Sequence, residues 1–131
     1  MRKAILMMLL AVVSSSAAAE WVNHGDSEAK GGFDIYVDPA TIRRSGNMAK
    51  MWVMYNFKAV QVTAGDRHLS LKTQAEYDCK DEQVRVLFFT AHSGHMGWGN
   101  IVHSSRTPGK WLPVPPDSVY ADNWKLACGK R

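Results

Sequence analysis

The clearest secondary-structure signal lies in residues 69–79, which read Leu69-Ser70-Leu71-Lys72-Thr73-Gln74-Ala75-Glu76-Tyr77-Asp78-Cys79. The odd positions are mostly apolar, and the even positions are polar or charged. Side chains of a β-strand alternate between two faces, so this pattern predicts a strand with one face on a core and the other in water, as in an antiparallel sheet. Because Cys79 falls on the apolar face, its sulfur is expected to point inward.

The segments on either side continue the β pattern. A polar turn at residues 80–82 leads into residues 83–91, whose two faces are both largely apolar, as expected of a central strand that completes a hairpin. Upstream, strands are predicted over residues 32–38 and 48–57. Between them, Asp38-Pro39 predicts one helical turn over residues 40–44, because aspartate suits a helix N-cap and proline the first helical position.

The C-terminal segment changes to a helical period. Asp117 or Ser118 can cap a helix, and Gly129 suits its end. Between these positions one helical face carries Tyr120, Trp124, Ala127 and Cys128. The predicted fold class is therefore α+β, mostly β: a small antiparallel sheet of about five to six strands with a C-terminal helix on one face.

The N-terminus has the physical character of a secretory signal peptide. Arg2 and Lys3 precede an apolar run over residues 4–13, and small residues follow up to Ala19. We therefore expect a signal peptide at residues 1–19 and one domain at residues 20–131. The apolar run is shorter than the ~20 residues that cross a bilayer, and no cysteine lies near the cleavage site. We expect an exported protein, periplasmic or secreted to the cell surface, with no transmembrane span and no lipid anchor.

Charge and cysteine content narrow the function further. The 16 Lys and Arg residues exceed the 12 Asp and Glu residues, but loss of Arg2 and Lys3 lowers the formal net charge from +4 to about +2. No Lys/Arg-rich run remains, which argues against a nucleic-acid partner. In an exported protein the two cysteines, Cys79 and Cys128, are most simply a disulfide, which would pin the helix to the sheet face carrying Tyr77.

Three histidines raise the question of a metal site. If the strands around residues 92–103 form a hairpin centred on Gly97-Trp98, His92 stands opposite His103, and His95 lies in the loop above them. Three imidazoles so placed would suffice for zinc or copper with one open position. The alternative is three ordinary polar histidines at a strand end and in a loop. No cofactor is predicted.

Candidate partner-binding residues are an aromatic and a basic group. Trp98, in a glycine-rich loop, is either an exposed aromatic of the type enriched at binding hot spots or a cover for the end of the sheet. Arg43, Arg44 and Lys50 form either a basic spot for an acidic partner or solvated surface. The chain lacks a Gly-x-Ser-x-Gly motif and a phosphate-binding glycine loop, and we expect no enzymatic activity.

Several segments together resemble the surface-adhesin protein E family of Gram-negative bacteria. They are residues 36–44 (YVDPATIRR), 76–79 (EYDC), 84–86 (VRV), Trp111, 114–118 (VPPDS) and 127–129 (ACG). The resemblance covers about residues 21–129. It implies a small antiparallel sheet with the C-terminal helix held against its concave face by a disulfide, here between Cys79 and Cys128. It also implies a non-enzymatic surface protein, the prototype being an adhesin for host extracellular-matrix proteins.

The leading functional hypothesis is thus an exported binding module that holds a protein or peptide partner, such as a host matrix protein. The alternative is a small periplasmic metal-binding protein or an envelope stress or structural protein. Exposed edges of so small a sheet would also allow a homodimer.

Overall fold

The computed structural model describes residues 19–130 and consists mainly of β-strands. The strands are β1 (Val22–Ser27), β2 (Phe33–Ser45), β3 (Met48–Thr63), β4 (Asp66–Asp78), β5 (Gln83–His92), β6 (Ile101–Ser105) and β7 (Leu112–Pro113). Two short 3-10 turns, η1 (Ala29–Gly31) and η2 (His95–Gly97), and one α-helix, α2 (Val119–Cys128), complete the described chain. The expected signal peptide at residues 1–19 lies, except for Ala19, outside the described residues. No described helix has both the length and the apolar character needed to span a bilayer.

From β1 to β6, the strands form an antiparallel meander in which each strand pairs with the next along the chain. The order across the sheet is β1-β2-β3-β4-β5-β6, and short β7 pairs with the beginning of β5. This confirms the predicted class, a mostly β fold with one C-terminal helix. The alternation in residues 69–79 corresponds to β4, and the predicted hairpin is β4–β5.

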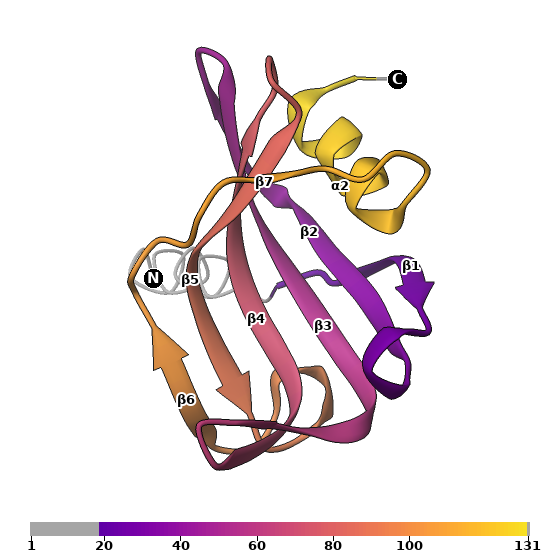
Figure 1. Cartoon of the computed structure of the whole chain (residues 1–131), viewed down its shortest axis with the longest axis vertical. Helices are drawn as coiled ribbons and strands as arrows, with labels where there is room; N and C mark the ends of the chain where they lie inside the picture. Colours follow the sequence, from indigo (N-terminus) through magenta and orange to yellow (C-terminus); the bar gives the residue numbers. More distant parts are fainter. Residues whose placement is uncertain (1–18, 131) are drawn as a thin grey trace, which may run out of the picture.

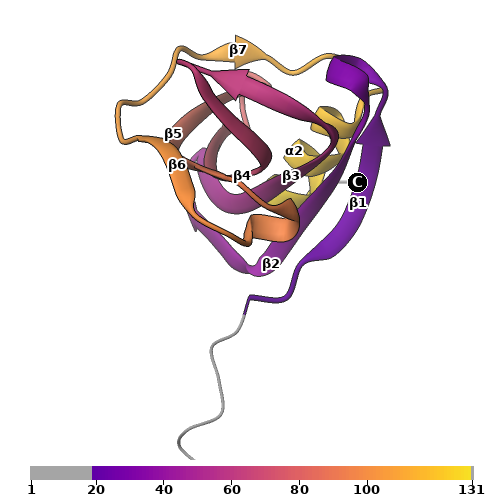
Figure 2. The same ribbon diagram turned by 90° about the horizontal axis from the view of Figure 1, so that it is seen from below.

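The sheet is strongly curled, and α2 lies inside its curve (Figures 1 and 2). Register shifts interrupt each of the five ladders that join β1 to β6. Such bulges bend a strand and increase its twist, which accounts for a sheet that wraps around the helix instead of lying flat. The result is a concave inner face and a convex outer face.

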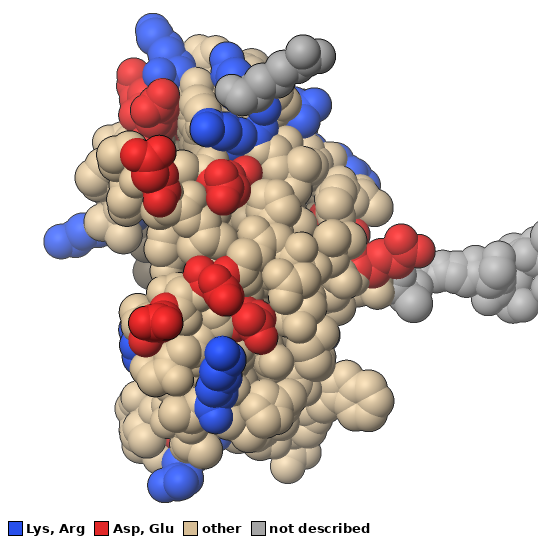
Figure 3. All heavy atoms as spheres, turned by 90° about the vertical axis from the view of Figure 1, so that its right-hand side faces the viewer, with Lys and Arg blue, Asp and Glu red and all other residues tan. Residues whose placement is uncertain are grey.

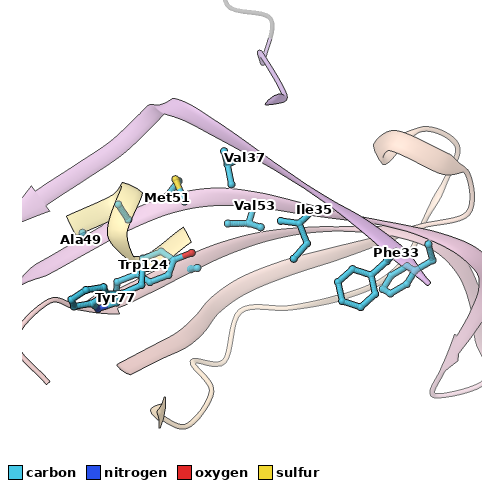
Figure 4. Packing of buried hydrophobic residues seen from close by; sticks show 11 residues of the cluster. Phe33, Ile35, Val37, Ala49, Met51, Val53, Tyr77 and Trp124 are labelled. Atoms are coloured by element: carbon cyan, nitrogen blue, oxygen red, sulfur yellow. The ribbon is translucent and has the colours of Figure 1, made fainter. Parts of the chain in front are cut away.

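The core fills the space between the inner face and α2. It contains Phe33, Ile35, Val37, Ala49, Met51, Val53, Phe57, Ala75, Tyr77, Trp124 and Ala127, all buried. Figure 4 shows Trp124 of the helix close to Ala49 and Tyr77 of the sheet. The inward residues of β2, β3 and β4 recur at every second position, as the sequence pattern predicted.

The helix is held at both ends and along its buried side. The Ser118 side chain accepts a hydrogen bond from the backbone nitrogen of Ala121, and Gly129 ends the helix in a left-handed conformation, φ +69°. The indole nitrogen of Trp124 donates to the carbonyl oxygen of Asp78 at 2.8 Å. The predicted disulfide between Cys79 and Cys128 is confirmed and ties the end of α2 to the sheet.

One local prediction is wrong. Residues 40–44 are not a helical turn but belong to β2, which bulges between Asp38 and Arg43 and then pairs again with β3. Within the bulge, the hydroxyl of Thr41 donates to the carbonyl oxygen of Asp38 and accepts from the backbone nitrogen of Trp52 on β3. The cross-strand pairing with β3 therefore overrides the local preference of Asp38-Pro39 for a helix start.

Candidate binding surfaces

The β5–β6 loop, residues 93–100, packs on the outer face of the sheet at the end shown lowest in Figure 1. Its main anchor is Ser70 of β4, which is fully buried. The Ser70 hydroxyl donates to the carbonyl oxygen of Gly94 at 2.7 Å and accepts from the backbone nitrogen of Gly97 at 2.8 Å. A second anchor is the side-chain oxygen of Asn56, which accepts from the backbone nitrogen of Met96.

The loop also closes on itself. The backbone nitrogen of Trp98 donates to the carbonyl oxygen of His95, and that of Ser93 donates to the carbonyl oxygen of Asn100. Gly97 and Gly99 have φ values of +75° and +80°, which glycine adopts without a steric cost. The loop is thus bonded both internally and to β3 and β4, and it presents its side chains on a fixed backbone.

Trp98 projects from this loop into solvent. Its side chain is 75% exposed, and Ile101, at the start of β6, is 60% exposed. Of the two alternatives drawn from the sequence, the exposed aromatic is therefore the one that the structure shows. We call Trp98, Ile101 and the rest of strand β6 the loop surface.

The expected convergence of the three histidines is wrong. Across the β5–β6 ladder His103 faces Ala91 and His92 faces Ile101, because the register shifts between Ala91 and His92. The ring of His92 shares a hydrogen bond with the hydroxyl of Thr90, whereas the Nε2 atom of His95 donates to the carbonyl oxygen of Phe57. Within residues 19–130, no three His, Cys, Asp or Glu side chains are grouped so that they could hold a metal ion.

The basic residues lie together but have different roles. Arg43, Arg44 and Lys50 line one shallow depression with Ser45, Met48 and Glu76. Arg43 faces Lys50 across the β2–β3 ladder, whereas Arg44 donates hydrogen bonds to the carbonyl oxygens of Ala127 (2.7 Å) and Leu126 (3.3 Å) at the end of α2. Figure 3 shows Lys and Arg side chains gathered at the end of the molecule where the C-terminus lies. Arg44 is therefore tied to the helix, whereas Arg43 is bonded within its own strand, where its Nη1 atom donates to the carbonyl oxygens of Ala40 (3.0 Å) and Ile42 (2.9 Å).

The inner face also contains a cavity that no sequence pattern indicated. It has a volume of about 570 Å³ and lies between the sheet, α2 and the chain segment around β7. Its lining includes Tyr55, Thr73, Tyr77, Leu112, Tyr120 and Asn123. The apolar alternation of β3 and β4 placed two of these tyrosines on the inner face, but nothing in the sequence indicated that space would remain between them and the helix.

Comparisons with known proteins identify the family of this chain and proteins that share its fold. The family profile of surface-adhesin protein E matches residues 21–129. Among solved structures, Haemophilus influenzae protein E superimposes with a TM-score of 0.61 at 11% identity, covering 87% of each chain. Its selenomethionine form gives 0.62 at 10% identity, covering 87% of this chain and 89% of that one. No match was found among curated proteins. At such low identity the solved structures establish the shared fold, and the family match over nearly the whole described chain shows that the protein belongs to the surface-adhesin protein E family.

Proposed function

We propose that this protein is an exported, non-enzymatic adhesin-type module that holds a protein partner at the loop surface. Membership of the surface-adhesin family supports the adhesin class. The observation that carries the choice of surface is Trp98, which is 75% exposed on a loop bonded to two strands. A partner of the class bound by adhesins, a host matrix protein, is the occupant that we propose.

Trp98 has the physical properties of a binding hot spot. Tryptophan is enriched among the few residues that dominate interface energies, because burial of its large ring removes much apolar surface from water. The bonds from Ser70 and Asn56 hold the loop before a partner arrives, so little conformational entropy is lost on binding.

The neighbouring strand adds a second means of recognition. Strand β6 ends the path β1-β2-β3-β4-β5-β6, and among the described strands its ladder partner is β5. The opposite edge of β6 can accept an extended peptide as an added strand, with backbone hydrogen bonds for affinity and exposed Ile101 for specificity.

The non-enzymatic character is supported by how the reactive residue types are used. Cys79 and Cys128 form the disulfide, and the rings of His92 and His95 bond to Thr90 and to the carbonyl oxygen of Phe57. These side chains serve the fold, which fits a binding protein.

The test is binding of the purified mature chain to immobilised host extracellular-matrix proteins, measured by biolayer interferometry. Trp98→Ala should weaken binding at least about tenfold, since loss of a hot spot costs more than about 1.4 kcal/mol. Val22→Ala is the control for loss of an exposed apolar side chain, because Val22 is 49% exposed on β1, at the other end of the strand order from β6. Equal binding by Trp98→Ala and the unmodified chain would refute the proposed surface.

Location is tested separately on intact cells. We expect added protease to digest the protein without lysis, as for a surface protein. Recovery in the periplasmic fraction alone would favour the alternative of a periplasmic protein over an adhesin.

A further inference from the structure

The inner-face cavity has the size and the walls of a small-molecule site. Ligand sites in proteins usually have volumes of about 300–1,000 Å³ and mainly apolar walls with a few polar groups. The volume here is about 570 Å³, and aliphatic walls come from Ala75, Val84, Val86 and Leu112. The cavity is open to solvent on the side of β7, where Leu112 is 59% exposed, so a small molecule can enter it.

The polar groups in the walls are mainly neutral hydroxyls and an amide. Tyr55 of β3, Tyr77 of β4 and Tyr120 of α2 all line the cavity. Burial raises the pKa of each phenol, and the proximity of Tyr120 further raises the pKa of Tyr55. The hydroxyls therefore stay protonated and can donate hydrogen bonds.

Asn123 adds a further donor to the same cavity. It is 2% exposed, and its side-chain oxygen is bonded to the Nδ1 atom of His24 at 2.7 Å. The amide nitrogen of Asn123 is the part of the side chain left for an occupant of the cavity. An occupant thus meets several donors, which calls for an acceptor oxygen on the ligand.

Charge in the cavity walls is confined to two cations, and neither favours an anionic occupant. The guanidinium of Arg85 is paired with Glu76 at 2.7 Å and lies over the Trp111 ring at 4.6 Å. Lys110 is exposed to solvent. Burying a carboxylate against the aliphatic walls, away from the solvent-exposed Lys110 ammonium, would be costly.

We propose that the cavity binds an uncharged, apolar small molecule with an acceptor oxygen, of the class of medium-chain alcohols, esters or ketones. The chain of the ligand lies along the aliphatic walls, and its oxygen, with two lone pairs, accepts from the Tyr120 hydroxyl and the Asn123 amide, which lie three positions apart on α2. This site is on the concave face, whereas the loop surface is on the outer face, so the two bind independently.

The first experiment measures binding of the fluorescent apolar amine N-phenyl-1-naphthylamine to the purified mature chain. We expect a saturable rise in fluorescence that 1-decanol reverses at pH 8. Decanoate, which has the same chain length and a charged head, should compete at least about tenfold more weakly because its carboxylate is desolvated. Absence of saturable binding would overturn the site, and equal competition by decanoate would overturn the selection for uncharged ligands.

Two variants locate the site. Ala75→Phe places a ring in the cavity and should abolish probe binding. Tyr120→Phe should lower the affinity for 1-decanol about fivefold, because one hydrogen bond is lost. The affinity for the probe, which has no oxygen, should stay unchanged in Tyr120→Phe. Tyr120 lies half-buried on the helix, so this variant keeps the test open if Ala75→Phe does not fold. Trp98→Ala is the control and should bind both compounds normally. Unchanged 1-decanol affinity in Tyr120→Phe would overturn the assigned hydrogen bonding.

Discussion

Removal of the disulfide between Cys79 and Cys128 should destabilise the protein by several kcal/mol. The bond joins residues separated by 49 positions, and the chain-entropy relation gives about 4 kcal/mol for closure of such a loop at 25 °C. Domains of this size have total stabilities of about 5–15 kcal/mol, so the bond contributes a large share. At about 4 °C per kcal/mol, the melting temperature should fall by roughly 15 °C.

The loss should be concentrated at the helix. Without the disulfide, α2 keeps its hydrogen bond from Trp124 to the carbonyl oxygen of Asp78, its contacts with Arg44 and the burial of Ala127. These contacts should hold the helix near the sheet but allow it to open more often. Amide exchange of α2 should therefore accelerate more than that of β3 and β4.

The assay is urea unfolding of the Cys79→Ala/Cys128→Ala variant, followed by tryptophan fluorescence, with hydrogen-exchange mass spectrometry on the same samples. Dithiothreitol should bring the unmodified chain to the stability of the variant and should not change the variant itself. A difference in unfolding free energy below about 1 kcal/mol, or exchange that rises equally in all elements, would refute the reasoning.

Three further outcomes follow from the described contacts. Arg44→Met should lower the free energy of unfolding by about 1–3 kcal/mol, because the charge-assisted bonds to the end of α2 are lost. Arg43→Met should change it by less than about 0.5 kcal/mol. Thermal unfolding of the two variants measures the contrast, and equal losses would contradict it. Ser70→Ala should lower the free energy of unfolding by about 2–3 kcal/mol, because the loop loses both bonds to Ser70. The Trp98 indole should become more mobile, which fluorescence anisotropy measures. Unchanged anisotropy would count against Ser70 as an anchor of the loop. Burial lowers the pKa of His68 and His92 below the usual 6.5, so the unfolded chain takes up protons first and stability should fall as the pH drops below about 6.5. Urea unfolding between pH 7.5 and 5 should show this decline, and a His68→Gln/His92→Gln variant that declines just as steeply would contradict the assignment.

The sequence by itself determined the class of the fold and the disulfide that joins the helix to the sheet. The period-two alternation of β4 and the helical period ending at Cys128 are set by local backbone geometry, which repeats along the chain and is visible without neighbours. The inward direction of Cys79 and a helix cap at Asp117 or Ser118 followed from the same local rules, and the structure shows that the cap is Ser118.

Tertiary structure decided where the strands bend and which residues of neighbouring strands face each other. The bulge after Asp38 replaced an expected helical turn, because pairing with β3 satisfies more backbone groups than an isolated turn does. The shift between Ala91 and His92 separated histidines that a symmetric hairpin would have aligned. The inner cavity depends on how closely the curled sheet approaches α2. The bulges in the strands and the side chains packed between sheet and helix set this distance together. These features arise from contacts between residues distant in the chain, and no local pattern encodes them.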